Sequence, residues 1–487
     1  MAVQQGYLII DIGTGNVRVA VTDQAGSILA LERDTMLYVK DEHYPDALHF
    51  DPNELWGRIQ TMTRKALQQL PHVSILAITA SSQREGIVLL DAAGNSLIGL
   101  SNHDHRGREW EDMIKDKHHV YALTGRYPSS LFSAFKVIGI KHRRPDIYRQ
   151  FAKMLSISDW AQYQFCGVEN YEPAQASETL LYDVEKGTWS SSLCQLFGID
   201  EAVLPPLRGA GTVLGPVLPA CAESLHIPAE AVVVVGGADT QLAVKSTMPS
   251  LDDIVIVSGT TTPIVKITDR YITDDKERTW TNRHVDSDHF ILEANAGVTG
   301  LNYQRLKEIF YPNESYQVIE KELADLSRSQ CVASLGSLVA EEKSPLTKGG
   351  FVFSTPVSHE LTRAGFVHAT LWDIACSIRE NLDVLCSVSG SSPHFVWACG
   401  GGFQSSLLRQ FTANLTGKKI RIREGYQQSS VTGAALVCNE ALGVQTALDV
   451  PVKEVVPQYN REQDAALYKE WKEARARFRQ SMMEDSL

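Results

Sequence analysis

Asp11-Ile12-Gly13-Thr14-Gly15-Asn16-Val17-Arg18 is the stretch of this sequence that decides the fold. The apolar run at 7–10 predicts a buried strand, and the alternating valines at 17–21 predict a second strand. The motif therefore lies in a tight turn between two strands. Glycines let turn amides approach an anion, and Thr14 adds a hydroxyl donor. With Asp11 as an anchor for a hydrated divalent cation, such a turn suits the phosphate tail of a magnesium-bound nucleotide.

Two common phosphate-binding loops do not fit this sequence. The chain has no Gly-x-x-x-x-Gly-Lys-Ser/Thr run, so it carries no P-loop. The Gly-x-Gly pattern of dinucleotide-binding folds begins at Gly13, but Arg18 replaces the third glycine and a strand follows instead of a helix. A hairpin turn that is rich in glycine for structural reasons alone stays open as the alternative.

Three more apolar runs end in turns that combine glycine with polar residues. They are 232–235 before Gly236-Gly237-Ala238-Asp239, 254–257 before Ser258-Gly259-Thr260, and 395–399 before Gly400-Gly401-Gly402-Phe403-Gln404. One such turn is usually structural. Several turns, spread over both halves of the chain, predict two lobes that close on one nucleotide.

Length and composition narrow the class of protein. The 487 residues indicate two to three domains, and 44% hydrophobic with 21% charged residues is typical of a globular protein. The net charge of −12 argues against nucleic acid or an anionic membrane as the main partner. We see no signal peptide and no apolar stretch of the ~20 residues that span a bilayer, and therefore expect a cytoplasmic protein with reduced cysteines.

Helical and strand patterns alternate along the chain, which predicts an α/β fold with helices that cover mixed sheets. Asp51 with Pro52 predicts the start of a helix that runs to about residue 70. Residues 205–228, rich in proline, glycine and alanine, are expected to connect the lobes. Apolar residues at helical spacing over 467–478 predict a docked C-terminal helix.

In their order along the chain, these motifs resemble the FGGY family of carbohydrate kinases, and the likeness covers nearly the whole sequence. The resemblance implies the two-lobed actin-like ATPase fold, related to ribonuclease H, in which each lobe is a mixed sheet flanked by helices. It places a substrate lobe at 1–243 and a nucleotide-binding lobe at 244–487. The matching segments are Asp11 to Arg18, Gln83-Arg84-Glu85, Asp104-x-Arg106, Gly236-Gly237-x-Asp239-x-Gln241, Gly259-Thr260, Gly300-x-x-x-Gln304, Gly400-Gly401-Gly402 and Gly433-Ala434-Ala435.

The resemblance implies ATP-dependent transfer of a phosphoryl group to a hydroxyl of a small sugar, polyol or related metabolite (EC 2.7.1 type), with Mg²⁺. Asp239 would be the general base for the acceptor hydroxyl, and Asp11 and Asp239 would hold the metal. The acceptor would contact Gln83, Arg84, Glu85, Asp104 and Asp239. The nucleotide would contact Gly13, Thr14, Gly15, Arg18, Gly259, Thr260, Gly300, Gln304, Gly400, Gly401, Gly402 and Gln404.

Each of these roles has a structural alternative. Asp239 and Asp11 could be turn-forming residues, and Arg18 could be a surface residue of its strand. The pair of Arg84 and Glu85 could be a structural ion pair at the rim of the fold, and the same holds for Asp104 with Arg106. The glycines at 400–402 could simply allow a helix to pack on a strand.

Within the family, residues 82–89, Asn102-x-Asp104-x-Arg106 and 157–160 are most similar to the autoinducer-2 kinase branch. After Gly259-Thr260, however, this chain has Thr-Thr-Pro where those kinases place bulky aromatic residues. The departure leaves the acceptor unassigned among sugars, polyols and autoinducer-like compounds.

Two other classes of function share this scaffold. A catalytically silent regulator would tend to lose Asp239 or carry a DNA-binding extension, and a chaperone-type ATPase would need a peptide-binding domain. We therefore expect an enzyme whose partners are ATP and a small hydroxylated substrate, and not nucleic acid or a membrane. The sequence leaves open whether the enzyme forms a homodimer.

Overall fold

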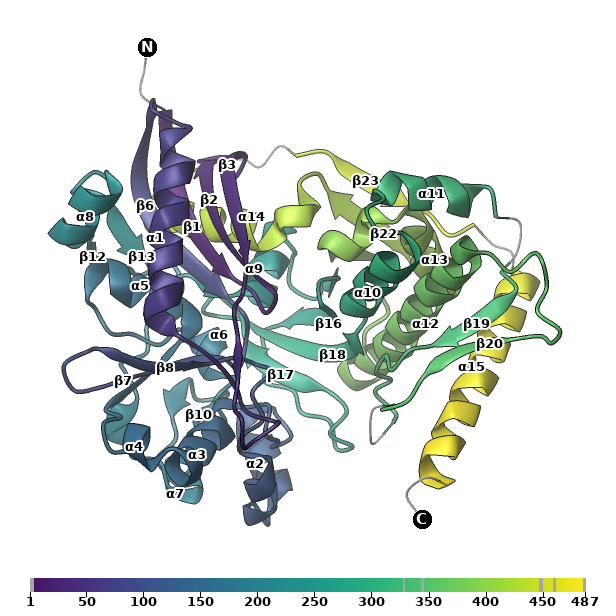
Figure 1. The fold of residues 1–487 in the computed structure, drawn as a ribbon, viewed down its shortest axis with the longest axis horizontal. Helices are drawn as coiled ribbons and strands as arrows, with labels where there is room; N and C mark the ends of the chain where they lie inside the picture. The colour runs from purple at the N-terminus through teal and green to yellow at the C-terminus, as the bar shows by residue number, and fades with distance from the viewer. Residues whose placement is uncertain (1–3, 327–328, 343–345, 446–449, 459–460, 485–487) are drawn as a thin grey trace. The chain divides into compact units, whose positions relative to one another are not determined.

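The computed structural model describes residues 4–326, 329–342, 346–445, 450–458 and 461–484. Helices and strands alternate along most of this chain, which confirms the predicted α/β class (Figure 1). The chain divides into two compact units, each built from several segments. The first unit contains Met1–Met248, Thr268–Ile291 and Gln428–Asp449, and the second contains Pro249–Ile267, Leu292–Gln427 and Val450–Leu487.

The main sheet of the first unit has the strand order β12-β13-β6-β1-β2-β3. Strand β1 is antiparallel to β2 and parallel to β6, so the C-terminal ends of β1 and β6 lie at one edge of the sheet. The strands are β1 (Gln4–Ile12), β2 (Asn16–Asp23), β3 (Ile28–Thr35), β6 (Val73–Ser82), β12 (Val213–Pro216) and β13 (Val232–Val234), with β14 (Gly237–Ala238) paired to β6.

Helices cover both faces of this sheet because alternate residues of a strand point to opposite sides. Leu8 and Ile10 of β1 lie in a core with α1 (Pro52–Gln68), α5 (Ile157–Cys166) and α8 (Pro219–Leu225). Tyr7 and Ile9 lie in a second core with α9 (Asp239–Ser246) and α14 (Ser429–Ala441). The run at 7–10 is therefore apolar throughout, as expected of a strand that is buried on both faces.

Helix α1 begins as its sequence predicts. The Asp51 side chain accepts hydrogen bonds from the backbone N–H groups of Asn53 and Glu54, and Pro52 occupies the first turn. These contacts satisfy amides that have no partner within the helix.

Helix α14 comes from near the C-terminal end of the sequence yet belongs to the first unit. A Cβ atom at Gly433 would lie 1.8 Å from the backbone oxygen of Leu242 in α9, so only glycine permits this approach. The Tyr7 hydroxyl of β1 donates to Asn439 Oδ1 at 2.6 Å. Helix α14 thus begins at Ser429, just before the Gly433-Ala434-Ala435 segment, and packs that segment on α9.

The prediction that residues 205–228 connect two lobes is wrong. This segment contains β12 and α8, which lie within the first unit and complete one edge of its main sheet. Leu214 and Leu225 are buried in the core beneath it. Proline and glycine mark the ends of these short elements instead of a linker.

A second sheet of the first unit has the order β4-β5-β8-β7-β9 and packs on helices that include α3 and α7. Its strands are β4 (Val39–Lys40), β5 (Leu48–Phe50), β7 (Ile87–Leu90), β8 (Ser96–Leu100) and β9 (Lys153–Ser156). The other elements of this region are α2 (Lys117–Thr124), α3 (Ser133–Arg143), α4 (Pro145–Tyr148), α6 (Pro173–Ala176), α7 (Ser191–Phe197), β10 (Tyr182–Asp183), β11 (Thr188–Trp189) and β17 (Trp280–Arg283).

The second unit has a sheet that contains the order β18-β16-β15-β21-β22-β23, with β15 parallel to β21 and antiparallel to β16. Its strands are β15 (Ile254–Val257), β16 (Thr261–Thr268), β18 (Phe290–Val298), β21 (Phe395–Cys399), β22 (Lys419–Arg423) and β23 (Val452–Val455), with β19 (Cys331–Ser334) and β20 (Gly350–Phe353) as a separate pair. Its helices are α10 (Gly300–Phe310), α11 (Tyr316–Ala324), α12 (Arg363–Ser389), α13 (Ser406–Thr416) and α15 (Arg461–Glu484).

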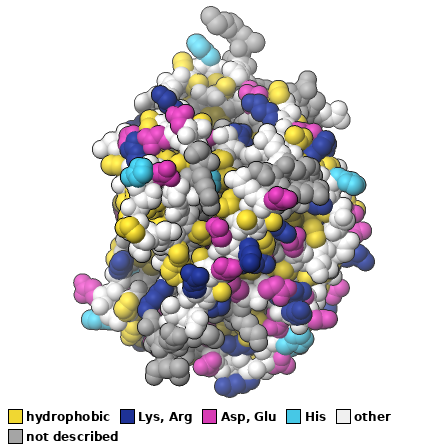
Figure 2. Space-filling view, turned by 90° about the vertical axis from the view of Figure 1, so that its right-hand side faces the viewer, with side chains coloured by type: hydrophobic (Ala, Val, Ile, Leu, Met, Phe, Trp, Pro, Cys, Tyr) yellow, Lys and Arg dark blue, Asp and Glu magenta, His cyan; other side chains and the backbone are white. Residues whose placement is uncertain are grey.

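The predicted C-terminal helix, α15, is docked. Trp471 is 1% exposed, and its indole N–H donates to Asp373 Oδ1 in α12 at 2.7 Å. Within the described part of the chain, no helix has the length and apolar character needed to cross a membrane. On the face seen in Figure 2, acidic and basic side chains are interspersed among apolar ones.

Candidate functional site

Three strand ends bring the candidate site together in the first unit. The register pairs Asp11 of β1 with Ser81 of β6, and Gly237 of β14 with the same Ser81. A Cβ atom at Gly236 would lie 1.9 Å from the backbone oxygen of Ala80, so glycine is required for β14 to approach β6. The first turn, the segment after Ser82 and the start of α9 at Asp239 therefore leave the sheet at one edge, where α/β proteins bind ligands.

Asp11 is fully buried, and one of its two carboxylate oxygens has polar partners within the protein. Oδ2 accepts a hydrogen bond from Ser430 Oγ at 2.9 Å and forms an ion pair with Arg18 Nη2. Oδ1 has no hydrogen-bond partner among the described residues. A buried carboxylate oxygen without a partner fits a water ligand of a divalent cation.

Arg18 is a part of this cluster and not an isolated surface residue. Besides Asp11, its guanidinium contacts Gln428 Oε1 at 2.5 Å and Ser430 Oγ at 3.4 Å. Its positive charge thus lies at the first turn, although it is engaged with Asp11 in this structure.

The first turn is closed and braced by its neighbours. The Gly13 N–H donates to the Asn16 oxygen at 2.9 Å, and Asn102 Nδ2 donates to Thr14 Oγ1 at 2.9 Å. Gln83 is 1% exposed; its Nε2 donates to the Gly13 oxygen at 3.4 Å and its Oε1 accepts from the Asn102 N–H at 3.0 Å. Gln83 therefore links the turn to residue 102.

Asp239 begins α9 and lies near the Asp11 carboxylate. The Thr240 N–H donates to its Oδ1 at 2.6 Å. Removal from water, followed by the negative charge of Asp11, raises the pKa of Asp239 to about 6, against the opposing charge of Arg84. A carboxylate with a pKa close to neutrality is suited to accept a proton.

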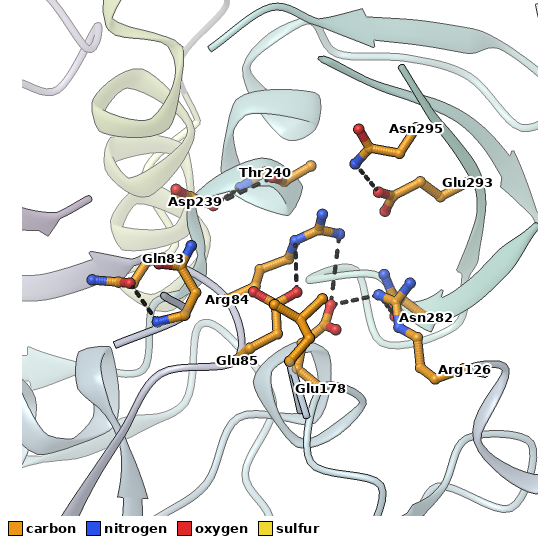
Figure 3. Close-up of polar contacts among 12 residues, drawn as sticks. Gln83, Arg84, Glu85, Arg126, Glu178, Asp239, Thr240, Asn282, Glu293 and Asn295 are labelled. Atoms are coloured by element: carbon orange, nitrogen blue, oxygen red, sulfur yellow. Dashed lines mark hydrogen bonds and ion pairs between the residues drawn. The ribbon is translucent and has the colours of Figure 1, made fainter. Parts of the chain in front are cut away.

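A buried cluster of charges follows Gln83 (Figure 3). Arg84 Nε lies 3.9 Å from Glu85 Oε1, and Arg84 Nη1 lies 3.6 Å from Glu178 Oε1. Glu178 Oε1 also accepts from Arg126 Nη2 at 2.6 Å, and Arg126 Nη2 donates to Asn282 Oδ1. Glu178, Arg126 and Asn282 of this cluster belong to none of the motifs found in the sequence.

Glu85 is unusual in its backbone and its charge. Its φ angle is +62°, in the left-handed region that residues with a side chain rarely adopt. Burial, reinforced by the charge of Glu178, raises the pKa of Glu85 to about 8. Strained backbone and a shifted pKa are both common at functional sites.

Asp104 has less freedom to contact a ligand. Both of its oxygens accept from Arg106 Nε, at 2.8 and 2.9 Å, and Oδ2 also accepts from the Leu48 N–H at 2.7 Å. Lys136 Nζ donates to its backbone oxygen at 2.8 Å. These contacts are those of a structural ion pair, and a contact of Asp104 with substrate stays a prediction.

The second unit gathers most of its predicted nucleotide residues around Ser258. A Cβ atom at Gly300, which begins α10, would lie 2.0 Å from the Gly259 oxygen. The Gly402 N–H donates to the Ser258 oxygen at 3.0 Å, and Gly400 adopts a φ of +94° beside the same residue. The turns at 259–260 and 400–402 and the N-terminus of α10 are therefore in contact, which suits anion binding.

Gln304 and Gln404 are exposed, and their side chains are less constrained. Gln304 Nε2 donates to Glu308 Oε1 one turn further along α10 at 3.0 Å. Gln404 ends the short 3-10 helix Gly401–Gln404. Their contact with a nucleotide stays a prediction.

Comparisons with known proteins identify the family of this chain. Residues 6–245 match the N-terminal domain of the FGGY family of carbohydrate kinases, and residues 321–442 match its C-terminal domain. YoaC of Bacillus subtilis (strain 168), named as a sugar kinase, is 48% identical over 98% of both chains. The autoinducer-2 kinase of Yersinia enterocolitica is 27% identical over 92% of this chain and 89% of its own.

Solved structures show the same fold. A xylulose kinase from Lactobacillus acidophilus has a TM-score of 0.82 and 19% identity, covering 97% of this chain and 98% of that one. A glycerol kinase from Plasmodium falciparum, solved with ADP, has a TM-score of 0.82 and 19% identity, covering 98% of each. The predicted actin-like ATPase fold is confirmed. The chain belongs to the FGGY family of carbohydrate kinases and is an ATP-dependent kinase that phosphorylates a hydroxyl group of a sugar or polyol.

Proposed function

We propose that Asp239 is the general base of this kinase and that Arg84 and Glu85 bind the acceptor beside it. The observation that carries the proposal is the placement of the Asp239 carboxyl group at the sheet edge, near the buried Asp11. The positive charge of Arg84 also acts on this carboxyl group. Asp239 takes the proton of the acceptor hydroxyl while that oxygen attacks the γ-phosphorus, and the bond from this phosphorus to the bridging oxygen breaks to release ADP. Arg84 and Glu85 orient the hydroxylated acceptor through hydrogen bonds.

The residues present fit a magnesium ion held mainly by water and phosphate. Asp11 Oδ1 is buried without a hydrogen-bond partner in the described chain, and Asp239 adds a second carboxylate nearby. Within the same residues, no group of three or more His, Cys, Asp or Glu side chains could hold a metal alone. Mg²⁺ usually keeps several waters and binds through one or two carboxylates plus phosphates, where it neutralises phosphate charge.

For the nucleotide, we propose contacts with the turn at 13–15, the segment 259–260, Gly300 and the glycines at 400–402. The support is the grouping of the last three around Ser258. That the substrate lobe ends near residue 243 and that both lobes bind one nucleotide stay predictions from the sequence. The net charge of −12 supports partners other than nucleic acid or an anionic membrane. Action in the cytoplasm and a homodimer stay predictions from the sequence.

A substrate panel tests the proposed reaction. ATP consumption should be measured with Mg²⁺ against ketoses, polyols and short hydroxylated carbonyl compounds, including autoinducer-2, and products should be identified by ³¹P NMR. We expect a phosphate monoester from at least one compound, and none from Asp239→Asn at the same ATP concentration. ATP hydrolysis without any phosphorylated acceptor would contradict the proposal.

A further inference from the structure

Glu178, in the loop that follows α6, is a buried anion shared by two arginines (Figure 3). Its Oε1 lies 2.6 Å from Arg126 Nη2 and 3.6 Å from Arg84 Nη1, and all three side chains are less than a tenth exposed. Arg126 is held in turn by Asn282 and by the Trp280 ring, whose centroid lies 4.4 Å from its Cζ. Four separate segments of the first unit therefore meet at one carboxylate.

The backbone ties Glu178 to Glu85. Ser133 Oγ, at the start of α3, donates to the Glu85 oxygen at 3.2 Å and to the Glu178 oxygen at 3.4 Å. The Ser133 hydroxyl therefore holds the backbone of Glu85 next to the backbone of Glu178. Two carboxyl groups held close together away from water cannot easily both carry a charge.

We propose that Glu178 is a positioning residue of the acceptor pocket. Together with Arg126 it fixes the Arg84 guanidinium, and its own negative charge keeps Glu85 in the neutral form that donates a hydrogen bond. This inference rests on the placement of Arg84 and Glu85 in the acceptor pocket proposed above. Its consequence is that residues 84 and 85 both offer hydrogen-bond donors, which favours an acceptor molecule with carbonyl or hydroxyl oxygens at this point.

The charges that face Glu85 support the proposal. Burial is the main cause that raises its pKa to about 8, and the Glu178 charge adds to it, whereas Arg84, Arg126 and Lys136 act in the opposite direction. Glu85 is therefore protonated at pH 7. Without Glu178, three cations would face the Glu85 carboxyl, and its ionised form would be favoured.

Unpaired polar atoms indicate that this cluster is not optimised for stability. Arg126 Nε and Nη1, Glu178 Oε2 and Asn282 Nδ2 are buried and have no hydrogen-bond partner in the part of the chain that the structure describes. Each such atom costs folding free energy, which is typical of sites kept for function.

Titration of Glu85 in the full-length protein without ligands tests the inference directly. Glutamate labelled with ¹³C at the carboxyl carbon gives one resonance per residue, and Glu85→Gln identifies that of Glu85. We expect a wild-type midpoint near 8, a midpoint lower by about one to three units in Glu178→Gln, and a higher one in Arg126→Gln. An unchanged midpoint in folded Glu178→Gln would overturn the inference, even if Arg126→Gln does not fold.

Kinetics add a second readout, with the acceptor from the panel that gives the highest turnover. Glu178→Gln should raise the KM for that acceptor about tenfold or more, as expected when a buried contact is lost, and leave the KM for ATP unchanged. Glu178→Asp should recover part of the loss, and Glu185→Gln, at an exposed position, should have no effect. Equal weakening of both substrates would contradict a positioning role. If no acceptor is phosphorylated, the proposed function fails, but the titration still decides this inference.

Discussion

Replacing Glu85 separates its role in acceptor binding from a structural one. Glu85 is 6% exposed, and its pKa of about 8 makes it a hydrogen-bond donor at pH 7. Glu85→Ala removes that donor and leaves a buried polar partner unsatisfied, which costs about 1–3 kcal/mol. Because ~1.4 kcal/mol corresponds to a factor of ten, the KM for the acceptor should rise roughly ten- to hundredfold.

Glu85→Gln is the matched control. Glutamine keeps the size of the side chain and an N–H donor, and both variants keep the Cβ atom that strains the backbone at a φ of +62°. Initial rates at varied acceptor and saturating ATP, and the reverse, give the two KM values. We expect the acceptor KM of Glu85→Gln to stay close to wild type and the ATP KM to be unchanged in both. Parallel increases in both KM values would refute a role in acceptor binding.

Three further predictions concern stability. Gly433→Ala places a Cβ atom 1.8 Å from a backbone oxygen of α9 and should lower the free energy of unfolding by about 1–3 kcal/mol. Gly57→Ala, with open space around it, should not lower the Tm, and equal Tm values for the two variants would contradict the close packing of α14 on α9. Burial raises the pKa of Glu172 from 4.5 to about 8. Its contribution to the free energy of unfolding is therefore complete below pH 4.5 and is lost as the pH rises through 8. The fall in Tm between these two pH values should be shallower in Glu172→Gln, and an identical slope would exclude Glu172 as its origin. Trp471→Ala should cost about 3–5 kcal/mol, and a loss no larger than that of the exposed Lys469→Ala would show that α15 is not docked.

Local patterns predicted the parts of the fold that depend on neighbours in sequence. The hairpin around Gly13 follows from alternation on both sides of a glycine turn, and α1 follows from the Asp51–Pro52 start signal. The turns at 259–260 and 400–402 were also recognised. The contact of these two turns at Ser258 could not be predicted, because hydrophobic periodicity does not reveal which strands pair or in what register.

Features that depend on distant segments were not predictable in this way. Helix α14 joins the first unit because small residues around Gly433 fit against α9, a partner about 190 positions earlier that no local pattern specifies. Glu178, Arg126 and Asn282 lie on three segments that only the fold brings together. Residues 172–183 around Glu178 mix polar and apolar side chains, so no local pattern marked its carboxylate as buried.

The turnover of Asp239→Asn tests the central claim most directly. Asparagine preserves the size of the side chain and an oxygen for the Thr240 N–H, but it cannot take a proton. With the best acceptor and saturating ATP and Mg²⁺, kcat should fall about 10²–10⁴-fold, while the Kd for ATP from calorimetry stays near the wild-type value. A kcat close to wild type, in a variant that binds ATP normally, would show that Asp239 is not the base.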